Sequence, residues 1–488
     1  MTGFEKHKNQ FAAYLVLFAV FFSALHSQAF SLGGPYSSWM SRSLGYRLPG
    51  DIGGPRPIDE EYRWNVPQLT YGFDTSFVEQ FGTNGVGAVE SAIRILNDLP
   101  PSDYITDQML LSAIWPLNST GSNPQAAVLN AYDLRSAILS RLLEHVGLAN
   151  AFRFQWTLRS RTANATSTNY VLINRNFDPV SLFPSSSING TQFGYGPILE
   201  GAYPDLETPF EVNVMKSPFS ANSIAGNPPS SGQSYSSLTY DDVGGLRFLY
   251  STNNVNLEGR PPGVTGVNGQ SVFTNALRGG VGKVQFLPHP TNGPGGSFSA
   301  FTNRFTDRFI VGAERKEQSL QRISQQPDLL FSVSDPLTNG FRPMIGGSDS
   351  LEWKTLNTNQ LKDGSGVIMG QAQITIRRIG PSVAGSSLLR QQWGFFDDSK
   401  IYWLSQSNSL GNSPTQNLAI HLRVQNPKPF DLRIPFTATN GQPVLLQQSS
   451  NLTNWSSGVR LTNYGASVDW RLPADSSNQF FRVIKPTP

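Results

Sequence analysis

The chain has no cysteine and only five histidines in 488 residues. Without cysteine it can form no disulfide bond and offers no sulfur ligand to zinc. Charged residues are also scarce, at 15%, and the formal net charge is only +3. The densest basic pairs, Arg315–Lys316 and Arg377–Arg378, are small enough to be solvated surface. We therefore expect no nucleic-acid partner.

Long apolar runs are confined to the start of the chain. Phe11–Leu25 is apolar apart from one serine, follows two lysines, and precedes Ser27-Gln-Ala29, whose small residues suit a signal peptidase. This run of 15 residues is short for a membrane-spanning helix, which needs about 20. We expect a signal peptide over residues 1–29 that is cleaved before Phe30; the alternative is a retained anchor.

Cleavage would leave a mature chain of about 460 residues, enough for two to four domains. Its net charge would be +2, because the removed segment carries Glu5, Lys6 and Lys8. A signal peptide, no cysteine and many Asn, Ser, Thr and Gly residues are typical of an exported bacterial protein. We expect it to be secreted, periplasmic or at the cell surface, with no membrane span after cleavage.

Composition shifts divide the mature chain into three expected domains. An α+β domain over residues 30–258 ends at the linker Gly259–Gly263, and a β-rich, sandwich-like domain follows over residues 264–425. After Asn426–Pro429 comes a small β module over residues 430–488. Within the middle domain, Glu314–Gln326 is predicted as an exposed polar helix or loop, because its apolar residues are thinly spaced.

The middle domain is expected to be a β-sandwich because short alternating strands are separated by Gly, Pro and Asn turns. The predicted strands are Lys283–Leu287, Arg308–Val311, Val367–Met369, Gln373–Arg377 and Leu418–Val424.

Familiar catalytic strings are missing from the sequence. There is no G-x-S-x-G, no Walker loop, and no G-x-G-x-x-G after a strand. Adjacent acids occur at Glu60–Glu61, Asp241–Asp242 and Asp397–Asp398, but such pairs are usually turn or surface residues. Asp241–Asp242 is accounted for as the start of a helix.

Asp133–Asn150, DLRSAILSRLLEHVGLAN, predicts a helix over residues 133–148. Apolar residues recur on one face at the spacing of a core-facing helix. They are Leu134, Ala137, Ile138, Leu142 and Val146. Gly147 supplies the C-terminal stop. By itself the segment predicts an ordinary core helix.

Other segments surround this helix in a recognisable order. A tryptophan and an L-T-Y strand come first, then an amphipathic helix, then a methionine segment, then a closing helix of the form D-x-x-G-[IL]-x-x-L-Y. These are Tyr62–Trp64, Leu69–Phe73, Val86–Asp98, Asn213–Pro218 and Tyr240–Tyr250. Together with Asp133–Asn150 they resemble a metzincin metalloprotease domain of the matrixin type, over roughly Glu60 to Tyr250.

The resemblance implies a site from which the zinc ligands have been lost. In the family motif HExxHxxGxxH, three histidines bind zinc and the glutamate activates the bound water. The three ligand positions here hold Ser140, Glu144 and Asn150, and the glutamate position holds Arg141. The motif's glycine and the methionine of the methionine turn are retained as Gly147 and Met215.

The remaining histidines do not restore a zinc site. Removing the signal peptide leaves His145, His289 and His421, in three different parts of the chain. Glu144 and His145 are neighbours on a helix and point about 100° apart. No calcium-binding D-x-[DN]-x-[DN]-G loop occurs either. We expect no catalytic residue, no metal and no cofactor. Zinc is expected as a cofactor only under the alternative that the domain is an active protease.

The last segment resembles a C-terminal β module found in secreted proteins of Verrucomicrobia-like bacteria. The string Ser449-Ser-Asn-Leu-Thr-Asn-Trp455 is followed by the strand Gln479–Val483, with weaker strand signals at Val444–Leu446 and Val468–Trp470. Trp455 and Phe480–Phe481 are expected to fill its core.

Two functions of different classes follow. The first is a non-catalytic exported protein whose metzincin-like domain serves binding or structural roles, with an extended peptide or extracellular polymer as partner. The second is a hydrolase, either a metallopeptidase with unrecognised ligands or an enzyme with a site in the β-rich region. The sequence predicts no oligomeric state.

Overall fold

The computed structural model forms two compact units, Met1–Asn97 with Pro101–Gln406 and Asp98–Pro100 with Ser407–Pro488. Both are built largely from strands, with helices in the first, so the chain is a mixed α and β multidomain protein. The structure describes residues 29–47, 51–111, 114–195, 214–215, 223–261, 263–292, 297–334, 353–357, 366–368, 372–377, 392–396, 401–404, 430–435, 443–449, 459–462, 467–472 and 480–484. Residues 1–28 of the predicted signal peptide, and His421, lie outside these residues.

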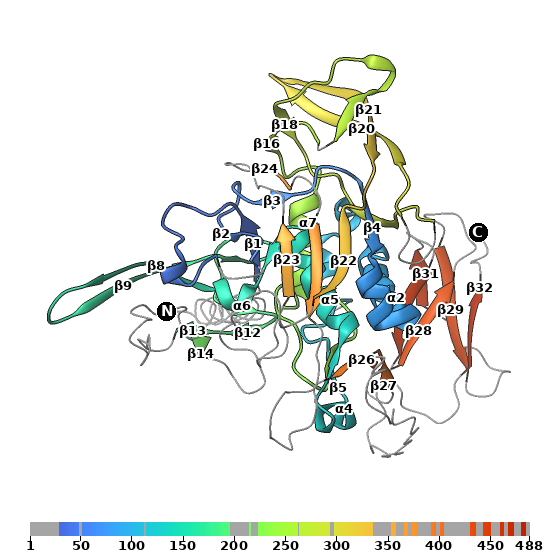
Figure 1. The fold of residues 1–488 in the computed structure, drawn as a ribbon, viewed down its shortest axis with the longest axis horizontal. Coiled ribbons are helices and arrows are strands. Elements are labelled where there is room, and N and C mark those ends of the chain that lie inside the picture. Colours follow the sequence, from blue (N-terminus) through green and yellow to red (C-terminus); the bar gives the residue numbers. More distant parts are fainter. Residues whose placement is uncertain are drawn as a thin grey trace, which may run out of the picture. The chain divides into compact units, whose positions relative to one another are not determined.

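The first unit is organised around a five-stranded sheet of order β19-β4-β22-β25-β23 (Figure 1). The strands are β19 Gln285–Pro288, β4 Gln68–Phe73, β22 Leu329–Ser334, β25 Ala372–Arg377 and β23 Trp353–Asn357. Neighbours are parallel except β23, which runs antiparallel to β25. The interior of β4 is buried on both faces, as parallel strands require. The predicted strand at Leu69–Phe73 is confirmed.

Helices pack against this sheet in successive layers. Helix α2, Thr75–Asn97, contacts β4, β19 and β22, and helix α5, Leu134–His145, packs on α2. Asp74 begins α2 by accepting the Phe77 N–H at 3.0 Å, and the helix kinks at Gly82. Helix α7, Tyr240–Tyr250, contacts a second sheet through strand β1, Phe30–Gly34. The helices predicted at residues 133–148 and Tyr240–Tyr250 are thus confirmed, whereas the one predicted at Val86–Asp98 begins earlier, at Thr75.

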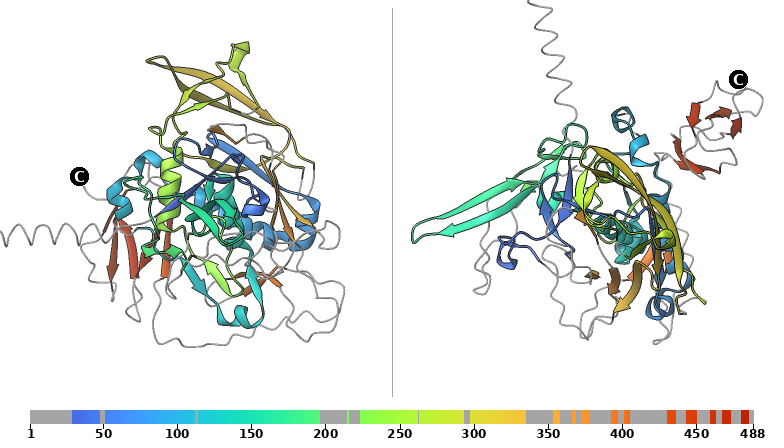
Figure 2. Two further views of the ribbon diagram at one scale, coloured as in Figure 1. Left: turned by 90° about the vertical axis from the view of Figure 1, so that its left-hand side faces the viewer. Right: turned by 90° about the horizontal axis from the view of Figure 1, so that it is seen from above.

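Strand β1 lies in the interior of its small sheet. It pairs antiparallel with β2, Gly54–Arg56, and with the short strands β7, Leu148–Ala149, and β10, Asn176–Phe177. Next to this sheet, the hairpin of β8, Trp156–Ala163, and β9, Thr168–Asn174, extends away from it (Figures 1 and 2).

Short elements complete the unit. The helices and turns are η1 Arg42–Leu44, η2 Ser102–Tyr104, α3 Asp107–Leu111, α4 Pro124–Val128, α6 Ala151–Phe154 and η3 Val267–Gly269. The remaining strand groups are β3 Tyr62–Arg63 with β24 Gly366–Val367; β5 Thr120–Ser122 with β15 Gln233–Tyr235; β6 Ala131–Asp133 with β26 Gln392–Phe396 and β27 Ile401–Trp403; β11 Ser187–Ile188 with β12 Thr191–Gln192; and β13 Gly194–Tyr195 with β14 Val214–Met215.

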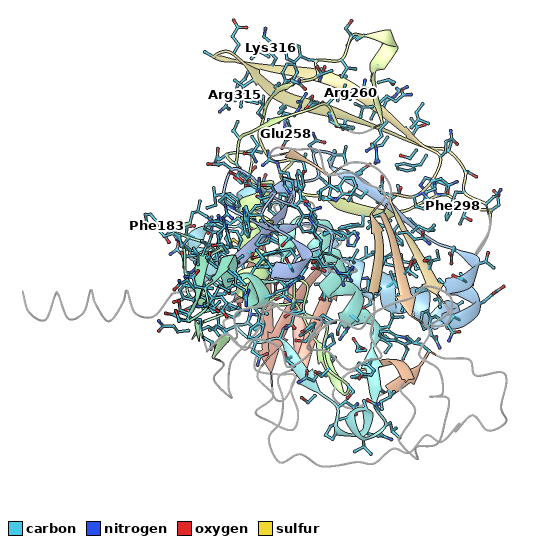
Figure 3. All side chains as sticks on the ribbon, turned by 60° about the vertical axis from the view of Figure 1, so that its left-hand side comes forward. Phe183, Glu258, Arg260, Phe298, Arg315 and Lys316 are labelled. Carbon is cyan, nitrogen blue, oxygen red and sulfur yellow. The ribbon has the colours of Figure 1, made fainter. Side chains whose placement is uncertain are left out.

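A five-stranded antiparallel sheet follows α7 in sequence. It contains β16 Asn256–Glu258, β18 Ala276–Arg278, β20 Phe301–Val311, β21 Glu314–Ser324 and β17 Val264–Gly266, in that spatial order. Arg315 and Lys316 lie near the free end of this sheet (Figure 3). The prediction of a helix or loop at Glu314–Gln326 is therefore wrong. The sequence does not show the alternation of apolar and polar residues that is typical of a strand, because the inward-facing Gln318 and Arg322 are polar. Gln318 bonds to Asp307, and Arg322 bonds to Asp328.

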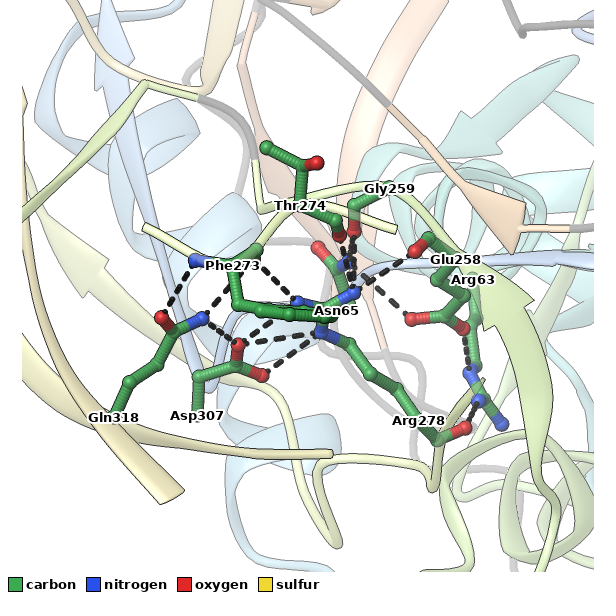
Figure 4. Close-up of polar contacts among 9 residues, drawn as sticks. All are labelled: Arg63, Asn65, Glu258, Gly259, Phe273, Thr274, Arg278, Asp307 and Gln318. Carbon is green, nitrogen blue, oxygen red and sulfur yellow. Dashed lines mark hydrogen bonds and ion pairs between the residues drawn. The ribbon is translucent and has the colours of Figure 1, made fainter. Parts of the chain in front are cut away.

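A buried charged network joins this sheet to the rest of the unit (Figure 4). Arg63 donates to Glu258 at 2.8 Å, and its other nitrogens reach the carbonyl oxygens of Leu249, Asn254 and Arg278. Arg278 in turn forms an ion pair with Asp307 at 3.0 Å. Both arginines are almost completely buried, so their bonding to several acceptors offsets the cost of removing charge from water.

The expected boundary at Gly259–Gly263 does not divide the structure. Strands β19, β22, β23 and β25 come after it, yet they complete the sheet of β4. Likewise β24 pairs with β3 and β26 with β6. A linker composition marks only a change of local structure, and long-range strand pairing determines which segments share a core. The first unit runs to Gln406, so residues 264–425 do not form a separate sandwich.

In the second unit, the described residues from Phe430 onward all lie in strands. Strand β28, Phe430–Pro435, pairs with β31, Ser467–Leu472, and β29, Pro443–Ser449, pairs with β30, Val459–Thr462, and β32, Phe480–Ile484. The predicted strands at Val444–Leu446, Val468–Trp470 and Gln479–Val483 are confirmed. Trp455 lies outside the described residues.

Candidate functional site

Helix α5 begins and ends with local signals that the sequence carries. Asp133 caps the start by accepting the Ser136 N–H at 2.8 Å, and its second oxygen accepts the Phe396 N–H at 2.9 Å. At the other end Gly147 has a φ of +107°, and a Cβ there would lie 2.2 Å from the Tyr62 carbonyl oxygen. Only glycine satisfies both the left-handed backbone and the close approach. The predicted stop at Gly147 is confirmed.

All three predicted ligand positions lie against the backbone of Gly226, although for Ser140 the contact is with its main-chain carbonyl group. The Gly226 N–H donates to the Ser140 carbonyl oxygen at 3.2 Å, and Asn150 Nδ2 donates to the Gly226 carbonyl oxygen at 2.8 Å. A Cβ on Gly226 would lie 2.7 Å from Glu144 Oε1. The loop Ser223–Asn227 therefore lies against all three positions.

Arg141 and Glu144 neutralise each other beside this loop. They form an ion pair one helical turn apart, with side chains 5% and 14% exposed. Burial raises the pKa of Glu144, and the Arg141 guanidinium opposes the rise. Arginine stays protonated at neutral pH and cannot take a proton from water. The position that the metzincin resemblance assigns to the general base thus holds an arginine, which is a poor choice for that role.

Asn150 has a structural role of its own. Its Oδ1 accepts the Arg153 N–H at 3.0 Å and so caps helix α6. Both polar groups of this side chain are then used, one for the cap and one for Gly226. The sequence could have suggested this cap, because asparagine is a favoured N-cap residue.

Asp242 holds the loop in place from the first turn of α7. Its carboxylate accepts the N–H groups of Ile224 and Ala225 at 3.1 Å, while a capping box joins it to Thr239. Asp242 is fully buried. The sequence identified it only as the start of a helix. The T-x-x-D spacing of Thr239 and Asp242 could have signalled the cap, but no local pattern could have signalled the loop.

Neither described histidine is placed as a fourth group for this site. His145 Nδ1 lies 2.8 Å from the Arg141 carbonyl oxygen, and Nε2 is buried with no described hydrogen-bond partner. Burial lowers the pKa of His145 to about 4. His289 contacts Thr70 and Ser299 in another part of the unit. Within the described ranges, no cluster of three His, Cys, Asp or Glu residues is arranged to hold a metal ion.

A small cavity borders Glu144 on the side facing β1. Asp51, Tyr62 and Phe154 also line it, and its volume is about 20 Å³. This is room for about one water molecule. Asp51 is bound by Arg153 through two contacts of 2.6 and 3.0 Å.

Met215 is paired with Gly194 across β13 and β14. The rest of the predicted methionine turn, Asn213–Pro218, lies outside the described residues, apart from Val214. Its relation to α5 stays a prediction.

Comparisons of the chain with models of protein families, with curated proteins and with solved structures find no match.

Proposed function

We propose that this is an exported, non-catalytic protein whose first unit contains a metzincin-like domain without zinc. The observation that carries the proposal is the position of Gly226. Its backbone bonds to the Ser140 carbonyl oxygen and to the Asn150 side chain, and it lies against Glu144. A domain that needed a metal there would have to leave that point open.

The chemistry of the surrounding groups supports the same conclusion. Zinc prefers nitrogen and sulfur ligands held close together on a fixed scaffold. Glu144 instead forms an ion pair with Arg141, and Asn150 is used by a helix cap and by Gly226. Each group is already engaged in stabilising the fold.

The proposed location is outside the cytoplasm, in the periplasm, at the cell surface or secreted. The apolar run Phe11–Leu25 and the small residues before Phe30 support it. Within the described residues, no helix is both long and apolar enough to cross a membrane.

The proposed role is binding or support, with an extended peptide or an extracellular polymer as partner. The resemblance to the metzincins supports a peptide, since a strand edge can bind an extended chain through its main-chain groups. Loss of the metal would remove hydrolysis and leave such binding intact.

Metal analysis of the mature protein, purified without chelator, tests the proposal. We expect zinc far below one atom per chain, and no cleavage of an unstructured protein substrate with or without added zinc. Stoichiometric zinc that a chelator removes, or chelator-sensitive cleavage, would establish the metallopeptidase instead. Cleavage that a chelator does not affect would point to a hydrolytic site in the β-rich region.

A constructive variant tests the inferred ancestry. Replacing Ser140, Glu144 and Asn150 by histidine recreates the ligand set, but the Gly226 backbone still fills its centre. We expect weak zinc binding by calorimetry in this variant, and tighter binding when Ser223–Asn227 is also lengthened by two glycines. No binding in either variant would argue against the proposed alignment.

A further inference from the structure

The β8–β9 hairpin has one strand edge that no neighbouring strand covers. Strand β9, Thr168–Asn174, pairs with β8, and within the described part of the chain no second strand lies on its other side. None of its seven residues is buried, and Val171 is 51% exposed. The hairpin extends away from the sheet of β1 (Figures 1 and 2). Two strands alone are at best marginally stable in water, so a third strand would stabilise the hairpin.

The edge formed by β8 is already protected. The Tyr46 hydroxyl donates to the Leu158 carbonyl oxygen at 2.7 Å, and the Arg159 guanidinium carbon lies 4.4 Å from the centre of the Trp39 ring. A β-bulge between Leu158 and Ser160 also interrupts this strand. Covering contacts and bulges are common devices that keep a strand edge from pairing with another chain. The described pairing shows no bulge on β9.

The sequence of β9 also lacks the charges that usually protect an exposed edge. It reads TNYVLIN, with no charged residue and no proline. Strand β21 is different: β17 pairs with it only at Leu320–Arg322, and the preceding residues Glu314–Glu317 are all charged and exposed. One projecting edge of the chain is thus protected by charge, whereas β9 is suited to pair with another strand.

The surroundings of β9 are basic. Residues 146–177 contain four arginines and no acidic residue. The arginines are Arg153, Arg159, Arg161 and Arg175. Arg153 is paired with Asp51. Arg159 and Arg161 lie on β8, and Arg161 is directly opposite Tyr170 of β9. A second copy of this hairpin would bring like charges together, whereas an acidic partner would be attracted.

We infer that β9 accepts an acidic, extended segment of another protein as the third strand of this hairpin. The main chain of the added strand would hydrogen-bond to β9, and its acidic side chains would supply the charge complementarity. Alternate side chains of a strand share one face, so acids at alternate positions would lie on the face of Tyr170 and Arg161. The inference rests on the proposed role in binding an extended peptide, and it assigns that binding to β9 rather than to Ser140, Glu144 and Asn150.

A synthetic peptide of the length of β9, in which glutamate alternates with valine, tests this inference. We expect the mature protein to bind the labelled peptide in a fluorescence anisotropy titration. Lysine in place of glutamate should abolish binding, because the charge is reversed. Proline in place of valine keeps the charge but prevents strand addition, and should weaken binding at least about tenfold. Absence of binding by the glutamate–valine peptide would overturn the inference, and so would equal binding of the proline peptide.

Two charge reversals locate the site. Arg161→Glu, opposite β9, should weaken binding of the glutamate–valine peptide at least about tenfold. Arg315→Glu, on the charged edge of β21, is the matched control and should leave binding unchanged. Equal losses in the two variants would overturn the inference. Tighter binding of polygalacturonate than of the peptide, weakened by Arg161→Glu, would also overturn it, because the partner would then be an acidic polysaccharide.

Hydrogen exchange of the unmodified protein gives an answer that depends on no variant. Peptide binding should slow amide exchange within Thr168–Asn174 and leave exchange within Glu314–Ser319 unchanged, as mass spectrometry would show. Slower exchange elsewhere but not in β9 would overturn the inference. None of these measurements involves a metal or hydrolysis. Failure of the inference is therefore distinguishable from failure of the proposed function, which is tested by zinc content and cleavage.

Discussion

Gly226→Ala is the sharpest test of the idea that backbone occupies the degenerate site. Gly226 has a φ of +65°, and an added Cβ would lie 2.7 Å from Glu144 Oε1 and 2.9 Å from Asn150 Cβ. The left-handed backbone costs an alanine about 1 kcal/mol. Forcing a methyl group into packed surroundings costs about 1–3 kcal/mol more. We therefore expect a loss of about 2–4 kcal/mol in the free energy of unfolding.

Gly312→Ala separates the two contributions. Gly312 has nearly the same φ, +64°, in the turn between β20 and β21, but nothing lies within 4 Å of an added Cβ. It should lose only the backbone term of about 1 kcal/mol. The assay is denaturant unfolding of both variants, followed by tryptophan fluorescence. If Gly226→Ala is no more destabilising than Gly312→Ala, the loop Ser223–Asn227 does not lie against the three predicted ligand positions.

Three further predictions concern pH, buried charge and metal. Burial lowers the pKa of His145 to about 4, from a value of about 6.5 in the unfolded chain. As the pH falls, the unfolded chain therefore binds a proton at His145 before the folded chain does, and the free energy of unfolding decreases between pH 6.5 and pH 4. Relative to His145→Asn, the wild type should lose about 3 kcal/mol over this range in pH-dependent denaturation, and parallel profiles would contradict the reasoning. Arg63→Ala should cost about 3–5 kcal/mol, because it leaves Glu258 buried without its partner, whereas Arg308→Ala in the exposed pair with Glu317 should cost under about 1 kcal/mol. Similar losses in the two variants would contradict the proposed role of the buried network. Removal of metal with a chelator should leave the melting temperature unchanged, and a drop of several degrees would show a structural ion.

Local signals were sufficient to predict α5, α7 and β4. Asp133 and Gly147 mark the two ends of α5, and Asp241–Asp242 mark the start of α7. These signals act within a few residues, so a single sequence displays them. The degenerate positions Ser140, Glu144 and Asn150 followed from counting along the same helix.

Strand β21 shows where local signals failed. Its inward side chains include Gln318 and Arg322, whose partners Asp307 and Asp328 come from neighbouring elements. Polar residues whose partners lie on another strand or loop look exposed in a sequence. The same limit applies to the sheet of β4, since the pairing of β19 and β22 with β4 joins segments more than 200 residues apart.

The sequence by itself determined which chemistry is missing: it has no cysteine, few histidines, and an arginine where the proposed metzincin alignment places the catalytic base. It also determined the helices, because caps and periodic apolar residues act locally. Only the tertiary structure decided what occupies the site, because Gly226 reaches Ser140 and Asn150 through a loop that is far away along the chain. Likewise, only folding brings Arg63 to Glu258. The physical reason is the same in both cases: burial and hydrogen bonding between distant segments depend on packing, and no local pattern of residues records it.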